Sequence, residues 1–144
     1  MSLYGNDRDS LRRVFFTTWE KYRQSQPLHG IEQLLVDTIL LHPEYHGILE
    51  DEDNLQRDFP PDLGETNPFL HMSLHVSIEE QLSIDRPSGI RGHYERLLTT
   101  SGDRHTTLHV MLECLAEAIW QSQRDPASDM DTTYLECLHR QEHS

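Results

Sequence analysis

Residues 67–82, with the sequence NPFLHMSLHVSIEEQL, carry the pattern that decides both the fold and the candidate site. The opening Asn-Pro pair is typical of a helix start, because Asn caps the first turn and Pro fits the first helical position. At about 100° per residue, His71 at 0° is followed by His75 at about 40° and Glu79 at about 80°. Leu74, Ile78 and Leu82 fall at about 300°, 340° and 20°, so both imidazoles border the stripe that should face a core. A polar ring in that position needs a partner, since an unsatisfied buried polar group is costly.

The same pattern recurs in the stretch HTTLHVMLE over residues 105–113. Its His105, His109 and Glu113 repeat the order His-x3-His-x3-Glu, which indicates either a degenerate internal repeat or two helices that converged on one task. Packed face to face, two such helices would bring four imidazoles and two carboxylates into one interior region. Imidazole and carboxylate together suit zinc, iron or manganese, and facing helices of a bundle are where such sites are built.

Histidine pairs are more frequent than chance predicts. Ten histidines scattered over 144 residues would give about 0.7 pairs at the i, i+4 spacing that puts both rings on one helix face. The chain has four such pairs. His42 and His46 are the expected contributors from a third helix, although Pro43 pushes the residue before it out of the helical conformation. The predicted metal ligands are therefore His42, His46, His71, His75, Glu79, His105, His109 and Glu113.

Such a ligand set would hold one or two ions of iron or zinc between helices. Iron would indicate oxygen or redox chemistry, and zinc with an open position would indicate a hydrolytic or Lewis-acid role. The ligand types and spacing resemble those of hemerythrin-like bundles, whereas the Glu-x-x-His pairs typical of ferritin-like proteins do not occur in these two stretches. The alternative is a metal-free interaction module, in which a buried His–Glu network fixes helix register and an acidic face meets a basic protein partner. The pattern by itself defines no reaction.

Apolar periodicity along the rest of the chain is helical, and no segment shows the sustained alternation of a strand. Helices are expected over residues 7–24, 31–41, 67–84, 88–100, 104–124 and 132–139, with a further helical turn over 44–49. Residues 50–66 read as an acidic loop, and residues 125–131 as a linker to the last helix. The expected fold is an all-α, single-domain bundle of five or six helices over residues 1–144.

Composition narrows the function classes. The net charge of −13 repels phosphate backbones and anionic membrane surfaces, so binding to nucleic acid or to a membrane is not expected. No apolar run approaches the ~20 residues that span a bilayer, and the N-terminus lacks the layout of an export signal, which favours a soluble, cytoplasmic protein. Cys114 and Cys137 are expected to be separate packing residues, neither a disulfide framework nor a metal cluster. Trp19 and Trp120 are expected in the core.

Four stretches together resemble a proteobacterial family of small, all-helical proteins of unknown function. They are HPEYH at residues 42–46, NPFLHMSLH at 67–75, DRPSGI at 85–90 and ECLAEAIW at 113–120. The similarity extends from the first helix to the last. It implies a bacterial, cytosolic protein with a single domain, and it brings no activity or substrate. The metal hypothesis therefore depends on the histidines themselves.

Overall fold

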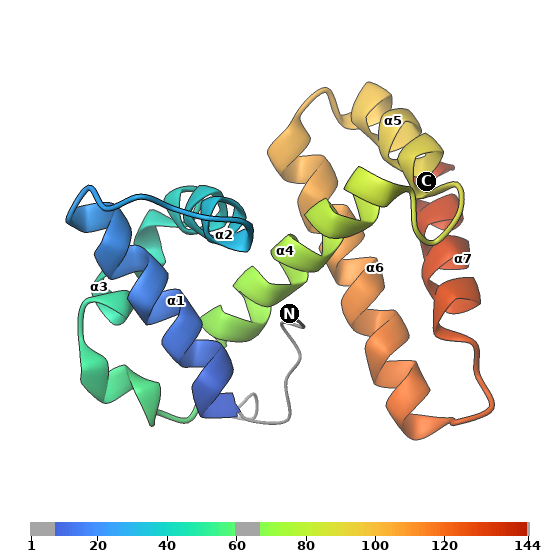
Figure 1. Ribbon diagram of the computed structural model, residues 1–144. Coiled ribbons are helices and arrows are strands. Elements are labelled where there is room, and N and C mark those ends of the chain that lie inside the picture. Colours follow the sequence, from blue (N-terminus) through green and yellow to red (C-terminus); the bar gives the residue numbers. More distant parts are fainter. Residues whose placement is uncertain (1–7, 60–66, 144) are drawn as a thin grey trace. The chain divides into compact units, whose positions relative to one another are not determined.

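The computed structural model describes residues 8–59 and 67–143 (Figure 1). Within those ranges the chain forms helices and no strand, which confirms the predicted all-α class. In chain order the elements are α1 (Arg8–Arg23), α2 (Ile31–Leu40), the 3₁₀ helix η1 (Pro43–Tyr45), α3 (His46–Leu49), the 3₁₀ helix η2 (Glu52–Leu55), α4 (Pro68–Ile84), α5 (Ile90–Ser101), α6 (Arg104–Arg124) and α7 (Met130–Glu142). None of these helices is both long enough and apolar enough to cross a bilayer.

The α-helices in the described ranges number seven, against the five or six expected. The extra helix is α3, because the segment after α2 forms a 3₁₀ turn and a short α-helix in place of one loose turn. The start of the expected 50–66 loop also contains η2, and residues 60–66 lie outside the described part of the chain. Short helices therefore form in this part of the chain, where the apolar periodicity of the sequence is weak.

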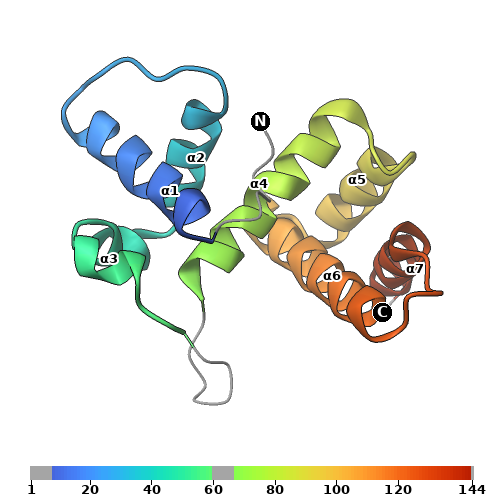
Figure 2. The same ribbon diagram turned by 60° about the horizontal axis from the view of Figure 1, so that its bottom comes forward.

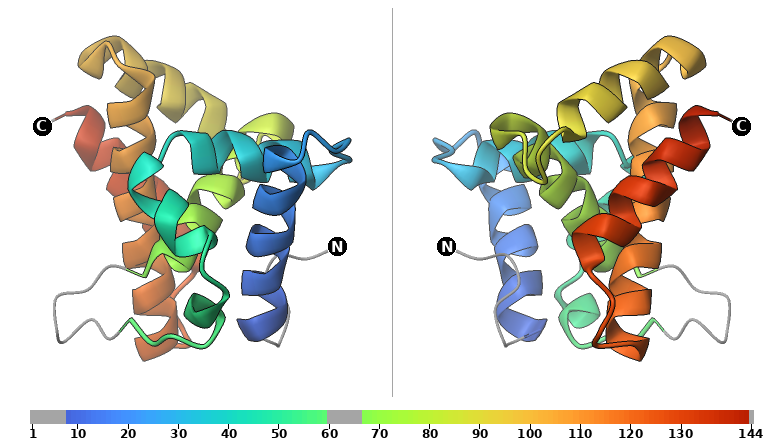
Figure 3. Two further views of the ribbon diagram at one scale, coloured as in Figure 1. Left: turned by 90° about the vertical axis from the view of Figure 1, so that its left-hand side faces the viewer. Right: turned by 90° about the vertical axis from the view of Figure 1, so that its right-hand side faces the viewer.

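The chain divides into two compact units, residues 1–76 and residues 77–144. In the first unit α1 packs along α2, as the blue and teal helices show in Figure 2. In the second unit α6 and α7 run side by side as a hairpin, visible in both views of Figure 3. Helix α4 contributes its first half to one unit and its second half to the other. The single domain expected over the whole chain stays a prediction.

Side-chain caps set the starts of the long helices. The side chain of Asn67 accepts hydrogen bonds at 3.0 and 3.2 Å from two backbone amides of the first turn of α4. Asp103 caps α6 in the same way, so both predicted starts are confirmed. The last helix begins earlier than expected, because Asp129 accepts a hydrogen bond from the backbone N–H of Asp131 and allows α7 to start at Met130.

Aromatic packing attaches the first half of α4 to α1. The ring of Phe69 lies edge-on to Phe15, with centroids 6.2 Å apart, and stacks on Phe16 at 5.9 Å. Trp19 belongs to the same core, as predicted. The buried cluster consists of Phe15, Phe16, Trp19, Leu35, Ile39, Leu49, Phe69, Met72 and Val76. Burial of these side chains, worth about 25 cal/mol per Å² of apolar surface, joins the start of α4 to α1 and α2 in one core.

A buried arginine fastens the segment around η2 to the same core. Arg12 Nη1 donates to the backbone carbonyls of Asn54 at 3.3 Å, Leu55 at 3.2 Å and Arg57 at 2.6 Å. Its guanidinium also lies 4.7 Å from the centroid of the Phe69 ring. Asn54 and Leu55 end the short helix η2 and Arg57 follows it, so these carbonyls need donors from outside the helix, and Arg12 supplies them.

We expect Arg12→Met to lower the free energy of unfolding by about 2–4 kcal/mol, because it removes the buried guanidinium that donates to three partly buried carbonyls. The exposed neighbour Arg13 provides the matched control, and Arg13→Met should change stability by less than about 0.5 kcal/mol. Urea denaturation of the two variants checks this. Equal effects of the two substitutions would contradict the role assigned to Arg12.

A disulfide joins the two helices of the C-terminal hairpin. Cys114 of α6 and Cys137 of α7 are bonded, with their Cα atoms 5.6 Å apart. Both residues are buried, so their expected place in the core is confirmed. The expectation that they are separate packing residues is wrong, because the hairpin brings together two cysteines that are 23 residues apart in the sequence.

Reduction of this disulfide should lower the free energy of unfolding by about 3 kcal/mol, since the closed loop restricts the unfolded chain. Thermal unfolding of the wild type with and without dithiothreitol measures the effect. The double variant Cys114→Ser/Cys137→Ser is the control, and its melting temperature should not respond to the reductant. A wild-type melting temperature that is equally insensitive would contradict a stabilising crosslink.

Candidate metal centre

Three imidazoles converge in the first unit. His71 and His75 lie one turn apart on α4, and His42 lies between α2 and η1. The Nε2 atom of His71 lies 3.2 Å from Nε2 of His42 and 3.2 Å from Nε2 of His75. His42 and His75 are shielded from solvent, at only 2% and 3% exposed, and His71 is half-buried. The structure thus brings together three of the eight predicted ligands from two chain segments.

Local backbone structure places His42 in this cluster. Pro43 cannot continue α2, and His42 adopts φ −128° and ψ 68° as the chain leaves the helix. Its Nδ1 lies 2.8 Å from the carbonyl oxygen of Thr38 in the last turn of α2. Because a carbonyl oxygen only accepts, Nδ1 carries the proton in this contact and Nε2 of the neutral ring keeps a lone pair. Such an outer hydrogen bond is the usual support of a metal-ligating histidine.

The nitrogen spacing suits a tetrahedral ion. Zinc–imidazole bonds of about 2.0–2.1 Å place neighbouring nitrogens about 3.3–3.4 Å apart, close to the 3.2 Å seen here. Hydrogen bonds explain the arrangement less well. Since Nε2 of neutral His42 can only accept, Nε2 of His71 would have to donate to it. The same atom would also have to accept from His75, and one nitrogen of a neutral imidazole cannot do both, so only one of the two contacts can be a hydrogen bond. A single cation can bind all three nitrogens at once.

Tyr45 covers one side of the cluster. Its ring is nearly parallel to that of His42, with centroids 5.4 Å apart, and lies edge-on to His71 at 6.0 Å. Burial, together with the nearby charge of Glu44, raises the pKa of Tyr45, so the phenol stays neutral at physiological pH. The tyrosine therefore shields the imidazoles without adding charge, and no spacing rule in the sequence points to it.

His46 takes a different place from the one its i, i+4 spacing predicts. Its Nε2 lies 2.9 Å from the carbonyl oxygen of Ile39, and its ring packs on Trp19 with centroids 4.4 Å apart. The pairing rule holds for a continuous α-helix, whereas a 3₁₀ turn separates His42 from His46. His46 therefore supports the end of α2, and its predicted role as a ligand receives no support from these contacts.

Glu79 follows His75 by one turn on α4, but its carboxylate pairs with another group. Arg104 of α6 forms a close hydrogen bond and ion pair with Glu79 within the second unit. The guanidinium contacts one oxygen of this carboxylate, Oε1, and competes with an ion for it. The sequence could not show this competition, because Arg104 is distant in the chain.

The ligands predicted on α6 lie beside its core stripe. The buried residues of this helix include Leu108, Met111, Leu112, Leu115 and Ala118. They project between about 220° and 340°, whereas His105, His109 and Glu113 project between about 0° and 80°. His105 and Glu113 are exposed, and the half-buried His109 contacts the His105 carbonyl through Nδ1 at 2.9 Å.

Trp120 lies on the same side of α6 as these residues, at about 60°. Its side chain is 53% exposed, and the guanidinium of Arg124 lies 4.4 Å from its ring centroid. The expectation that Trp120 belongs to the core is therefore wrong. The buried face of α6 extends to the side away from the histidines, beyond the positions of its leucines.

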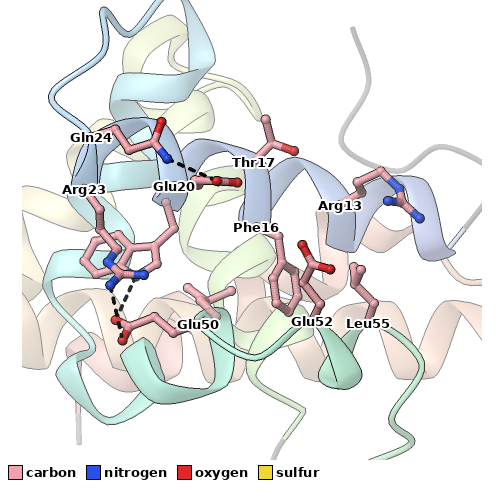
Figure 4. Close-up of a pocket in the computed structure, with 11 residues that line it drawn as sticks. Arg13, Phe16, Thr17, Glu20, Arg23, Gln24, Glu50, Glu52 and Leu55 are labelled. Atoms are coloured by element: carbon pink, nitrogen blue, oxygen red, sulfur yellow. Dashed lines mark hydrogen bonds and ion pairs between the residues drawn. The ribbon is translucent and has the colours of Figure 1, made fainter.

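A separate cavity of about 390 Å³ lies against α1 in the first unit (Figure 4). Trp19 Nε1 donates to Glu50 at 3.2 Å, and Arg23 lies 4.0 Å from the same carboxylate. None of the three clustered histidines lines this cavity. Its acidic and basic groups largely compensate each other, so the imidazole cluster is the stronger candidate site.

The sequence profile of a protein family described as a domain of unknown function, DUF1841, matches residues 7–140. The chain belongs to this family. The match confirms the resemblance to an all-helical family of unknown function that its motifs indicate. Neither the comparison with curated proteins nor the comparison with solved structures gives a match. The chemistry of the site therefore has to be argued from the residues.

Proposed function

We propose that the protein binds a single transition-metal ion through Nε2 of His42, His71 and His75. The observation that carries this proposal is the convergence of three Nε2 atoms at successive distances of 3.2 Å in a buried setting. Imidazole nitrogens suit zinc and iron, and the spacing agrees with the shorter bonds of a tetrahedral site. One ion is enough to account for three ligands, which favours the mononuclear form of the site.

The fourth ligand is proposed from the sequence pattern. His109 repeats the position of His75 in the His-x3-His-x3-Glu motif, and its Nδ1 contacts the His105 carbonyl, the kind of outer hydrogen bond that supports ligating histidines. We therefore propose His109 as the fourth protein ligand. Glu79 and Glu113 are left out of this set, because Arg104 binds the first and the second is exposed on α6.

The nature of the fourth ligand decides what the site can do. Four imidazoles would close the coordination shell and favour a structural or redox role. Three imidazoles and a water molecule would instead form the open arrangement of a hydrolytic zinc site, in which neutral ligands leave the ion its double charge. Measuring the contribution of His109 therefore also separates these two classes of function.

The metal-free alternative has less support. It requires a buried network in which carboxylates satisfy the imidazoles, and one of the two predicted carboxylates, Glu79, is bound to Arg104. In addition, only one of the two nitrogen–nitrogen contacts in the cluster could then be a hydrogen bond. A bound cation removes this conflict.

Elemental analysis of protein purified without an affinity tag tests the proposal. We expect about one equivalent of zinc or iron at the cluster after reloading, and we expect His42→Ala and His75→Ala each to remove it. His46→Ala is the matched control, because His46 lies four residues from His42 and contacts Ile39 instead of the cluster. Circular dichroism confirms that each variant is folded.

Two outcomes would contradict the proposal. Wild-type protein that remains free of zinc and iron after reloading would contradict it directly. Retention of the cluster's ion in His42→Ala would exclude these three residues as its ligands. Under the proposed ligand set, His109→Ala keeps the site but weakens affinity at least tenfold, whereas unchanged affinity would assign the fourth position to water.

A further inference from the structure

A second group of potential ligands lies at the end of α7. His139, Glu142 and His143 occupy positions i, i+3 and i+4, which share one helix face. One ligand atom from each of the three lies within 4.8 Å of the others. The two imidazole centroids are 4.6 Å apart, and His139 Nδ1 lies 3.9 Å from Glu142 Oε2. All three belong to the second unit, apart from the cluster of the first unit.

The carboxylate of this group is held in place from α5. Glu142 has a side chain only 6% exposed, forms a close hydrogen bond with His93 Nδ1, and lies 3.2 Å from Arg96 Nε. Burial alone would raise the pKa of Glu142, but the hydrogen bonds from His93 and Arg96 lower it, so the group is ionised at neutral pH. Each carboxylate oxygen has two lone pairs, so Oε2 can face Arg96 and still coordinate an ion.

The two histidines are accessible to an incoming ion. His139 has a side chain 65% exposed, and His143 is exposed at the end of the helix. A hollow of about 520 Å³, lined in part by His93 and His139, opens beside His139. Exposed imidazoles rotate freely, so their nitrogens can approach to the roughly 3 Å separations that a first coordination shell needs.

We propose that His139, Glu142 and His143 form a second metal site, which takes a divalent transition ion such as Zn²⁺ or Ni²⁺. Two imidazoles and one carboxylate form a ligand set that such ions prefer. The fixed carboxylate distinguishes this group from an ordinary exposed histidine pair, because hydrogen bonds from His93 and Arg96 correspond to the outer support that ligating carboxylates usually have. Binding would fasten the last turn of α7 to α5 through Glu142.

Metal stoichiometry in the full chain tests this site. Isothermal titration of tag-free protein with ZnCl₂ should show one more bound equivalent in the wild type than in His139→Ala/His143→Ala. Both replaced side chains are exposed, so this variant should fold like the wild type. His29→Ala, at a lone exposed histidine in the loop before α2, is the control and should bind as the wild type does. Glu142→Gln should weaken the α7 site at least tenfold.

The result is distinguishable from a failure of the first proposal. If the cluster of His42, His71 and His75 holds no ion, the wild type still binds one equivalent and the α7 double variant binds none. Addition of paramagnetic Ni²⁺ should also broaden the ring resonances of His139 and His143 before that of His29. Equal stoichiometry and affinity in the wild type and the double variant would overturn the second site.

Discussion

The convergence of Nε2 of His42, His71 and His75, at successive distances of 3.2 Å, is the constraint on which the candidate site depends. The hydrogen bond from His42 to the Thr38 carbonyl assigns the proton of that ring to Nδ1 and directs Nε2 toward His71. Polar groups removed from water need partners, and a single cation could bind all three of these nitrogens. An ion satisfies this requirement, whereas hydrogen bonds among the three neutral rings satisfy only part of it.

The surrounding fold holds these rings at short range. The Phe69 ring, packed on Phe15 and Phe16, attaches the start of α4 to α1 and thereby positions His71 and His75. Arg12 binds the segment after α3 to the same core. The rigid elements therefore carry the ligands, which is the arrangement that keeps a metal site in its binding geometry before the ion arrives.

Local rules predicted the helices well and the ligand set only in part. The cap of Asn67 and the periodicity of α4 and α6 are properties of neighbouring residues, so the boundaries of these helices follow from the sequence. Positions such as those of His46 and Glu79 depend on a 3₁₀ turn and on an arginine that is distant in the chain. The Cys114–Cys137 disulfide likewise depends on helix pairing, which single-sequence patterns do not reveal.

X-ray absorption spectroscopy of the zinc-loaded protein tests the central claim most directly. Using the chain in which both α7 histidines are replaced by alanine ensures that only the first-unit cluster contributes. The account predicts at least three nitrogen ligands at about 2.0–2.1 Å, with the multiple-scattering signature of imidazole rings. A first shell made of oxygen atoms, without imidazole scattering, would show that the three histidines do not share an ion.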